Sequence, residues 1–247
     1  MVGKSQIKFI KSLQQKKYRN KNGLFIVEGM KTVQELLDST IEANKIYCTD
    51  ADLFRDHQHI LELVSEIDLK RLSSLKNPNK VIGLFKIPEV ENRVLNDWTV
   101  VLDDVRDPGN LGTIIRLCDW FGIPNLICSE QTVDCYNPKV LQATMGSIAR
   151  VTISYTDLKD FLSKTQLPVL GTFMKETSIY DSKLPAKGIL VMGNEANGIS
   201  EEIEALVQSK ISIPQFGSEH TESLNVATAT AIFLNEIRRD GKNLIQK

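Results

Sequence analysis

Apolar and polar positions follow two different patterns along this chain, and the change falls near residue 98. From there onward, strand-length apolar runs recur, with helical segments between most of them. The runs read TVVLDD, NLICS, RVTISY, PVLGTF, GILVMG and KISIP. Apolar runs of this kind are typical of strands buried on both faces of a parallel sheet. We therefore predict an α/β domain over residues 98–247 with a mostly parallel sheet, ending in a long helix over residues 223–239.

Residues 1–88 have the pattern of a second, smaller α/β domain. Ile7, Ile10 and Leu13 fall on one face of a predicted helix, with lysines on another face. The stretches LFIVEG, NKIYC and KVIGLFK are strand-like. The polar, proline-bearing stretch that follows is assigned as a linker over residues 89–97.

Composition narrows the class of protein. The chain has 247 residues, of which 42% are hydrophobic and 25% charged, as in an ordinary globular protein. Because the net charge is only −1, any nucleic-acid binding must come from a local basic patch. The apolar runs are too short to span a membrane, and no apolar segment follows the N-terminal lysines to mark a secretory signal. We expect a cytoplasmic protein that has no membrane partner.

The four cysteines form no CxxC pair and fall inside predicted elements. We expect them to be reduced core thiols, with a metal site or a disulfide as the alternative. They are Cys48, Cys118, Cys128 and Cys135.

The first of three chemically unusual loops reads DPGNLGTIIR and follows an apolar strand. Asn110 is a suitable N-cap for the helix that follows. Gly112 costs that helix about 1 kcal/mol relative to alanine, but it lets a ligand or another backbone approach closely. Arg116 lies four residues further on, on the same helical face. The alternative is a plain capped helix in which Arg116 pairs with a core carboxylate, Asp103 or Asp104.

The second loop reads VMGNEANGIS, and Gly193 and Gly198 bracket Glu195 in it. This is neither the GxGxxG pattern nor a P-loop, but two glycines around a carboxylate suggest a backbone cradle for a ligand. The alternative is a simple turn from strand to helix with Ser200 as the N-cap.

The third loop follows the strand that ends near Ile213, and Ser223 and Asn225 begin a helix rich in small residues after it. The alternative here is a capped helix in a tight core. His220 lies in the polar part of the loop, and we expect it to be solvated. In open α/β sheets, ligands bind at the C-terminal ends of the strands, where all three loops are predicted to lie.

Together the three loops resemble the SpoU/TrmH class of the SPOUT superfamily, the RNA ribose 2′-O-methyltransferases. The motif Asn-x-Gly-x-x-x-Arg is met by Asn110, Gly112 and Arg116, and Gly-x-Glu-x-x-Gly by Gly193, Glu195 and Gly198. The motif Ile-Pro … Ser-Leu-Asn-Val is met by Ile213, Pro214, Ser223, Leu224, Asn225 and Val226. Residues 1–88 are similar to the substrate-binding domain often fused to these enzymes, which is itself similar to RNA-binding ribosomal proteins.

The resemblance implies a deep trefoil knot, a homodimer and S-adenosylmethionine as methyl donor, with no metal. It assigns catalytic roles to Asn110, Arg116, Glu195, Ser223 and Asn225, and cofactor contacts to Thr172, Gly193, Ile213 and Leu224. Glu195 would hold Arg116, either directly or through its loop. The family account makes Arg116 the base. Because arginine keeps its proton, a role in orienting the phosphate or the hydroxyl is physically easier.

RNA contacts are expected on a basic stretch near the N-terminus, at Lys16, Lys17, Arg19 and Lys21, next to Tyr18. The alternative is a helix that is basic only for solubility.

The N-terminal domain favours ribosomal RNA, of the large subunit, over transfer RNA as the substrate. Other classes that the sequence leaves open are a non-catalytic RNA-binding ribosome-assembly factor and a nucleotide-dependent α/β enzyme. The loop Gln215–Glu222 looks longer than in the family and carries Glu219 and His220.

Overall fold

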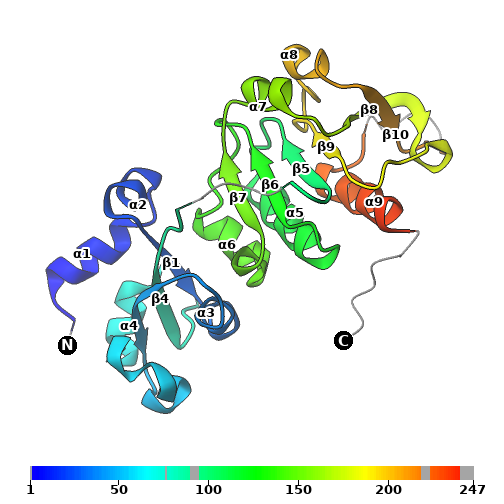
Figure 1. The fold of residues 1–247 in the computed structure, drawn as a ribbon. Coiled ribbons are helices and arrows are strands. Elements are labelled where there is room, and N and C mark those ends of the chain that lie inside the picture. The colour runs from blue at the N-terminus through cyan, green and yellow to red at the C-terminus, as the bar shows by residue number, and fades with distance from the viewer. Residues whose placement is uncertain (1, 76, 90–94, 218–222, 240–247) are drawn as a thin grey trace. The chain divides into compact units, whose positions relative to one another are not determined.

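The computed structural model in Figure 1 describes residues 2–75, 77–89, 95–217 and 223–239. The chain divides into two compact units. The first comprises Met1–Glu89 together with Asp134–Arg150, and the second comprises Val90–Val133 together with Val151–Lys247. Residues 134–150 of the predicted second domain thus pack with the first unit. Most of the predicted linker, residues 89–97, lies outside the described residues.

The first unit is built on a four-stranded sheet. β4 pairs antiparallel with both β1 and β2, and β2 pairs parallel with β3. In sheet order the strands are β1 (Leu24–Glu28), β4 (Val81–Lys86), β2 (Ala43–Cys48) and β3 (Leu61–Leu63). Its helices are α1 (Lys4–Ser12), α2 (Lys16–Asn22), α3 (Met30–Leu37), α4 (Glu66–Leu72) and α6 (Pro138–Thr144), with 3-10 segments η1 (Ala51–Ile60) and η2 (Ser147–Ala149).

The apolar face predicted for the first helix forms part of this unit's core. Ile10 and Leu13 are fully buried, and Ile7 packs against the same cluster. Their neighbours include Ile26 and Ile82 from the sheet. The helix itself ends at Ser12, so Leu13 is its C-cap residue. Burial of these side chains fixes α1 on the sheet.

The second unit contains a six-stranded sheet in which every pairing is parallel, as predicted. In order the strands are β10 (Ser209–Ser212), β8 (Val169–Ser178), β9 (Ile189–Met192), β5 (Thr99–Leu102), β6 (Asn125–Cys128) and β7 (Thr152–Tyr155). The central strands β9, β5 and β6 are buried along their whole length. This explains why they read as continuous apolar runs.

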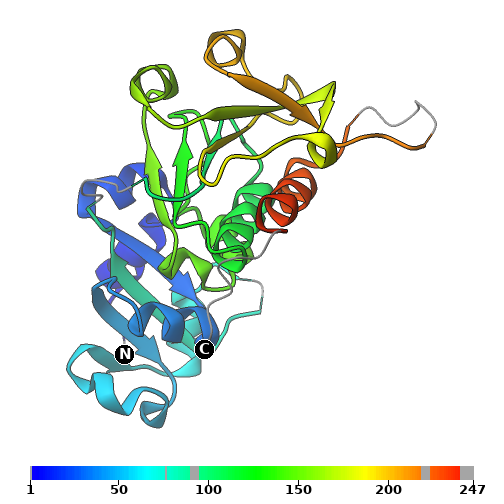
Figure 2. The same cartoon turned by 45° about the vertical axis from the view of Figure 1, so that its right-hand side comes forward.

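Helices cover both faces of this sheet. On one face α5 (Pro108–Trp120) and α9 (Val226–Arg238) lie side by side, as Figures 1 and 2 show. On the other lie α7 (Leu158–Lys164) and the short α8 (Glu201–Glu204), whose Leu162 and Ile203 pack against Val101 and Val191. A 3-10 turn, η3 (Ile179–Asp181), follows β8. The predicted helix over residues 223–239 begins later than expected, at Val226.

None of the helices in the described part of the chain is long and apolar enough to cross a membrane. The trefoil knot implied by the family resemblance stays a prediction.

Candidate functional site

The first two unusual loops leave the sheet at the same edge, because β5 and β9 pair in parallel with Leu102 opposite Met192. Buried Asp103 then accepts hydrogen bonds from both the backbone N–H and the hydroxyl of Ser200, each at 2.8 Å. The Asn194 side chain donates to the carbonyl oxygen of Asp104 at 2.6 Å. These bonds hold the two loops together.

Arg116 does not take up the core position that one sequence-based alternative gave it. The carboxylate of Asp103 is used by Ser200, and that of Asp104 binds Arg106 at 2.7 Å. Arg116 is exposed on α5, and no described residue makes a hydrogen bond or an ion pair with it. The alternative in which Arg116 pairs with Asp103 or Asp104 is therefore wrong.

The cap of α5 also differs from the prediction. Asp107, not Asn110, is the N-cap residue, and its carboxylate accepts from the backbone N–H of Asn110 at 2.8 Å. Pro108 follows at the first helical position, where it needs no hydrogen-bond partner. An aspartate directly before such a proline is the sequence signal that could have identified this cap. Because Asp107 does the capping, the side chain of Asn110 is left for other contacts.

The side chain of Asn110 forms hydrogen bonds to residues of both other loops. Its Nδ2 donates to Oε1 of Glu195 at 2.8 Å, and its Oδ1 accepts from Nδ2 of Asn225, also at 2.8 Å. Asn225 in turn caps α9, because its Oδ1 accepts from the backbone N–H groups of Ala227 and Thr228. Three of the residues expected in one site, Asn110, Glu195 and Asn225, thus meet through their side chains.

Glu195 was expected to hold Arg116 either directly or through its loop, and the direct contact is not found. Its carboxylate accepts from Asn110, and no hydrogen bond or ion pair joins it to Arg116. Ser200 is the N-cap residue of α8, as the alternative for this loop expected. Its hydroxyl makes no cap bond there and donates to Asp103 instead.

The glycines of the second loop are required by its geometry. A Cβ atom on Gly193 would lie 2.2 Å from the carbonyl carbon of Gly198 and 2.3 Å from the nitrogen of Ile199. Asn194 and Gly198 exchange two backbone hydrogen bonds of 2.9 Å, and Gly198 has a φ of +69°. The loop is therefore a tight backbone turn that carries Glu195 at its exposed tip.

Asn194, which the sequence reasoning did not select, holds that turn in shape. Its Oδ1 accepts from the backbone N–H groups of Ala196 and Asn197 at 2.8 and 3.2 Å, while its Nδ2 reaches Asp104. Asparagine is common in turns because its side chain can hydrogen-bond to the backbone two residues later in the chain. The position of Asn194 between a strand and a loop bracketed by glycines could therefore have identified it from the sequence.

A cavity of about 780 Å³ lies beside the second and third loops. All four residues predicted to contact the cofactor line it, and so do Glu195 and Ser223. Its apolar walls come from Phe173, Met192, Ile199, Val226 and Phe233. The volume lies within the range of about 300–1,000 Å³ that is usual for small-molecule sites. The third loop is only partly described, because residues 218–222, including Glu219 and His220, lie outside the described residues.

The chemistry of this cavity fits S-adenosylmethionine. Apolar side chains suit a purine ring, and Glu195, which lines the same cavity, supplies a carboxylate as counter-charge for a sulfonium or an ammonium group; the carboxylate of Glu204, another lining residue, is paired with Lys210. Thr172 is held in the lining of the cavity, because its hydroxyl donates to the carbonyl of Val191 at 3.0 Å.

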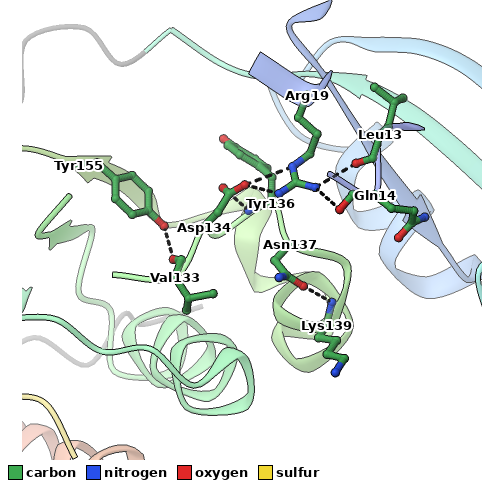
Figure 3. Close-up of polar contacts among 9 residues, drawn as sticks. All are labelled: Leu13, Gln14, Arg19, Val133, Asp134, Tyr136, Asn137, Lys139 and Tyr155. Carbon is green, nitrogen blue, oxygen red and sulfur yellow. Dashed lines mark hydrogen bonds and ion pairs between the residues drawn. The ribbon is translucent and has the colours of Figure 1, made fainter. Parts of the chain in front are cut away.

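The predicted RNA-contacting residues on α2 are not all available. Lys16, Lys17 and Lys21 are exposed. Arg19 is only 2% exposed, and its guanidinium binds Asp134 and two backbone carbonyls (Figure 3). The prediction that Arg19 contacts RNA is therefore wrong, because its donors are already used inside the protein.

The four cysteines are buried, and none of them is in a disulfide. Burial raises the pKa of the Cys118 thiol on α5 far above its usual range, so this thiol stays protonated and unreactive. Within the described ranges, no group of three or more His, Cys, Asp or Glu side chains could hold a metal ion.

Comparison with known proteins places the chain in a family. The model of the SpoU rRNA Methylase family matches residues 97–235, and that of the MRM3-like substrate binding domain matches residues 4–83. The chain belongs to the SpoU rRNA methylase family. It is 28% identical over 242 residues to the 23S rRNA (guanosine(2553)-2′-O)-methyltransferase RlmP of Bacillus subtilis, covering 94% of this chain and 96% of that protein.

Solved structures agree with this assignment. A protein assigned to the TrmH family of RNA methyltransferases, from Porphyromonas gingivalis, is 37% identical with a TM-score of 0.90, covering 97% of this chain and 99% of that one. An AdoMet-bound rRNA methyltransferase from Sinorhizobium meliloti is 29% identical with a TM-score of 0.87, covering 98% of both chains.

These matches confirm the family and the α/β fold with a mostly parallel sheet. They also confirm that the chain is an RNA methyltransferase that uses S-adenosylmethionine as its methyl donor.

Proposed function

We propose that this chain transfers the methyl group of S-adenosylmethionine to the 2′-hydroxyl of one ribose in large-subunit ribosomal RNA. The observation that carries the proposal is that side-chain hydrogen bonds join Asn110, Glu195 and Asn225 from three separate loops, and that Glu195 among them lines a cavity of suitable size and lining. The full-length similarity to a 23S rRNA enzyme, together with a substrate-binding domain of the same family type, favours ribosomal over transfer RNA.

S-adenosylmethionine supplies an electrophilic methyl group when it is bound. Thr172, Gly193, Ile213 and Leu224 would hold it against the apolar walls of the cavity. Gly193 would contact the cofactor through its backbone atoms. No side chain fits at this position, because the turn from Asn194 to Gly198 packs directly against it. Ser223 lines the same cavity from the third loop.

The residues outside the cavity position the RNA. Arg116 has no partner among the described residues, so its guanidinium can donate to the reacting ribose or to an adjacent phosphate. Because arginine stays protonated, we assign it to orienting the hydroxyl and lowering its pKa by its positive charge, so that the proton can leave to solvent. Asn110 stays hydrogen-bonded to both Glu195 and Asn225 and so keeps the three loops in fixed positions relative to one another.

Three further features belong to the proposal. Lys16, Lys17 and Lys21 would bind RNA phosphates without reading sequence. Trp120, at the end of α5, is 81% exposed, which supports a homodimer in which a second copy covers it. Four reduced, buried cysteines support a cytoplasmic location.

The test is methyl transfer in vitro. Purified protein is mixed with methyl-labelled S-adenosylmethionine and either large-subunit ribosomal RNA or bulk transfer RNA, each taken from cells that lack this gene. The proposal expects label at the 2′-oxygen of a single ribose in the ribosomal RNA. Label in transfer RNA alone would make the chain a transfer-RNA enzyme. RNA binding without any transfer would favour a non-catalytic assembly factor.

A further inference from the structure

The backbone of Asp104, two residues after β5 in the second unit, has an uncommon conformation. Its φ is +58°, in the left-handed region that residues other than glycine rarely adopt. Its N–H donates to the hydroxyl of Ser129 at 2.9 Å, and its carboxylate accepts from Arg106 at 2.7 Å. Its carbonyl accepts from Nδ2 of Asn194, in the second loop, at 2.6 Å. Strained backbone that several contacts hold in place is concentrated at functional sites, so the bond between Asn194 and Asp104 is a candidate for a functional role.

The two ends of the Asn194 side chain make different contacts. Oδ1 accepts from the backbone N–H groups of Ala196 and Asn197, at 2.8 and 3.2 Å, and so shapes the turn that lines the cavity. Nδ2 attaches this turn to the first motif loop through Asp104. Because the acceptor and the donor of a carboxamide are separate atoms, a substitution can remove one contact and keep the other. The family pattern Gly-x-Glu-x-x-Gly leaves position 194 open, so the motif assigns it no role.

Glu195 follows Asn194 directly, and its position depends on this attachment. Its Oε1 accepts from Asn110 at 2.8 Å, which joins the same two loops a second time. Two neighbouring residues of the second loop thus bind two separate places in the first loop, at Asp104 and at Asn110. Two bonds between the same pair of loops resist a rotation that a single bond would allow, so they fix the direction of the Glu195 side chain.

The bonds between Ser200 and Asp103 do not replace this attachment. Ser200 stands beyond Gly198, at the far end of the turn, and its N–H and hydroxyl both bind the carboxylate of Asp103. The bond from Asn194 is the one that acts on the residue next to Glu195.

We propose that Asn194 is a positioning residue for the methyl transfer. Its bond to the carbonyl of Asp104 holds Glu195 against Asn110, so that the turn lining the cofactor cavity stays aligned with the loop that leads to Arg116. All of these contacts lie within the second unit. This inference rests on the proposed function.

The test uses the full-length protein with Asn194→Asp and, as matched control, Gln166→Glu. An aspartate at position 194 keeps the acceptor for the turn but has no donor, and its charge opposes the carbonyl of Asp104. Gln166 is exposed between α7 and β8, at the opposite end of the parallel strands from the motif loops, so Gln166→Glu makes the same change from amide to carboxylate away from the site. Single-turnover methyl transfer is measured at saturating ribosomal RNA and S-adenosylmethionine, with S-adenosylmethionine affinity by calorimetry and folding by circular dichroism.

We expect Asn194→Asp to slow the saturated rate by about 10- to 100-fold, as small misplacements do. S-adenosylmethionine affinity should fall by no more than about twofold, because asparagine and aspartate both accept from the backbone two residues later in the chain. Gln166→Glu should leave the rate and the affinity unchanged. A role in folding alone would lower stability and leave the saturated rate of the folded protein at the wild-type value.

A second pair of variants tests the carbonyl of Asp104 and leaves Asn194 in place. Asp104→Gly and Asp104→Ala both remove the carboxylate, but only glycine adopts a φ of +58° without strain. The carbonyl keeps its place in Asp104→Gly, so the saturated rate of this variant should exceed that of Asp104→Ala by about fivefold or more.

The inference is overturned if folded Asn194→Asp protein transfers methyl groups at the wild-type rate, or if its only defect is weaker S-adenosylmethionine binding. It is also overturned if Gln166→Glu slows the rate equally, because the effect would then come from charge alone, or if Asp104→Gly is no faster than Asp104→Ala. A wild-type protein that binds S-adenosylmethionine but methylates no RNA would overturn the proposed function itself.

Discussion

Asn110 and Glu195 are 85 positions apart in the sequence, and the amide Nδ2 of Asn110 donates to the carboxylate Oε1 of Glu195 at 2.8 Å. The same amide accepts from Asn225, so a single side chain connects the three motif loops. A carboxamide suits this place because it has both a donor and an acceptor. The site is therefore held together by side chains whose own positions are set by helix caps and tight turns.

Replacing Asn110 with alanine should disconnect the loops. We expect methyl transfer to fall by about 10- to 100-fold from lost positioning. The free energy of unfolding should fall by only about 1 kcal/mol, because these hydrogen bonds are near the surface. Enzyme kinetics and urea unfolding measure the two effects. Thr113→Ala, which removes a 2.8 Å hydroxyl bond within the same helix, is the control and should keep full activity. Equal losses in both variants would contradict the account.

Arg116 should contribute to activity and not to stability. Because its guanidinium is exposed and has no described partner, Arg116→Ala should change the unfolding free energy by less than about 0.5 kcal/mol. The saturated transfer rate should fall by about 100-fold or more if the guanidinium stabilises charge at the reacting hydroxyl. Lys159→Ala, which removes an exposed charge from α7, should leave the rate unchanged. A wild-type rate for Arg116→Ala would remove this residue from the mechanism.

Gly193 should tolerate no side chain. A Cβ atom there would meet the backbone of Gly198 and Ile199 at 2.2 to 2.5 Å, so Gly193→Ala must displace the turn that lines the cavity. We expect S-adenosylmethionine affinity, measured by calorimetry, to fall at least about tenfold, which corresponds to 1.4 kcal/mol. Gly217 lines the same cavity but has free space for a Cβ atom, so Gly217→Ala should bind normally. Normal binding by Gly193→Ala would contradict the assigned cavity.

The ion pair between Asp97 and Arg238 should make stability depend on pH. Partial burial raises the pKa of Asp97, but hydrogen bonds from Arg238 and from the backbone N–H of Trp98 outweigh it, and the pKa is lowered overall. A carboxyl whose folded pKa is depressed stabilises the protein above its unfolded pKa of about 3.9, and that stability is lost as the pH falls through the lower, folded value.

Asp97→Asn should therefore cost about 1 kcal/mol at pH 7, a modest value because the pair is partly exposed. The difference from wild type should stay constant down to about pH 5 and shrink below about pH 4. Unfolding free energies measured by urea titration across this range test the prediction. A difference that grows toward acid pH would show that the sign is wrong.

Trp120 should lie in the interface if the protein is a homodimer. Large aromatic side chains at interface centres commonly contribute about 2 kcal/mol or more, so Trp120→Ala should weaken dimer formation by about 30-fold or more. Sedimentation equilibrium distinguishes the 27.8 kDa monomer from a species of twice that mass. Leu63→Ala, which removes an exposed apolar side chain from β3, is the control. If the two variants have the same dimer affinity, Trp120 lies outside the interface.

Much of the second unit could be predicted because its strands are buried on both faces. Continuous apolar runs such as residues 99–102 and 189–192 allow few other structures, and the turn and cap residues between them set the element boundaries. The motif loops were placed correctly at the strand ends for the same reason.

What could not be predicted was which side chains meet. Asn110 and Asp107 are both good caps, and only the position of Pro108 decides between them. Arg19 lies in a run of basic residues and looks solvent-exposed, but its partner Asp134 is 115 positions away, at a distance where local pattern carries no information. Long-range pairs of this kind also brought residues 134–150 into the first unit.

The central claim is tested most directly by mapping ribose methylation in total ribosomal and transfer RNA from cells with and without this gene. The account predicts that one 2′-O-methyl site in large-subunit ribosomal RNA disappears with the gene. The site should return with the wild-type protein but not with Arg116→Ala. If no site changes, and the purified protein fails to bind S-adenosylmethionine, the account is contradicted.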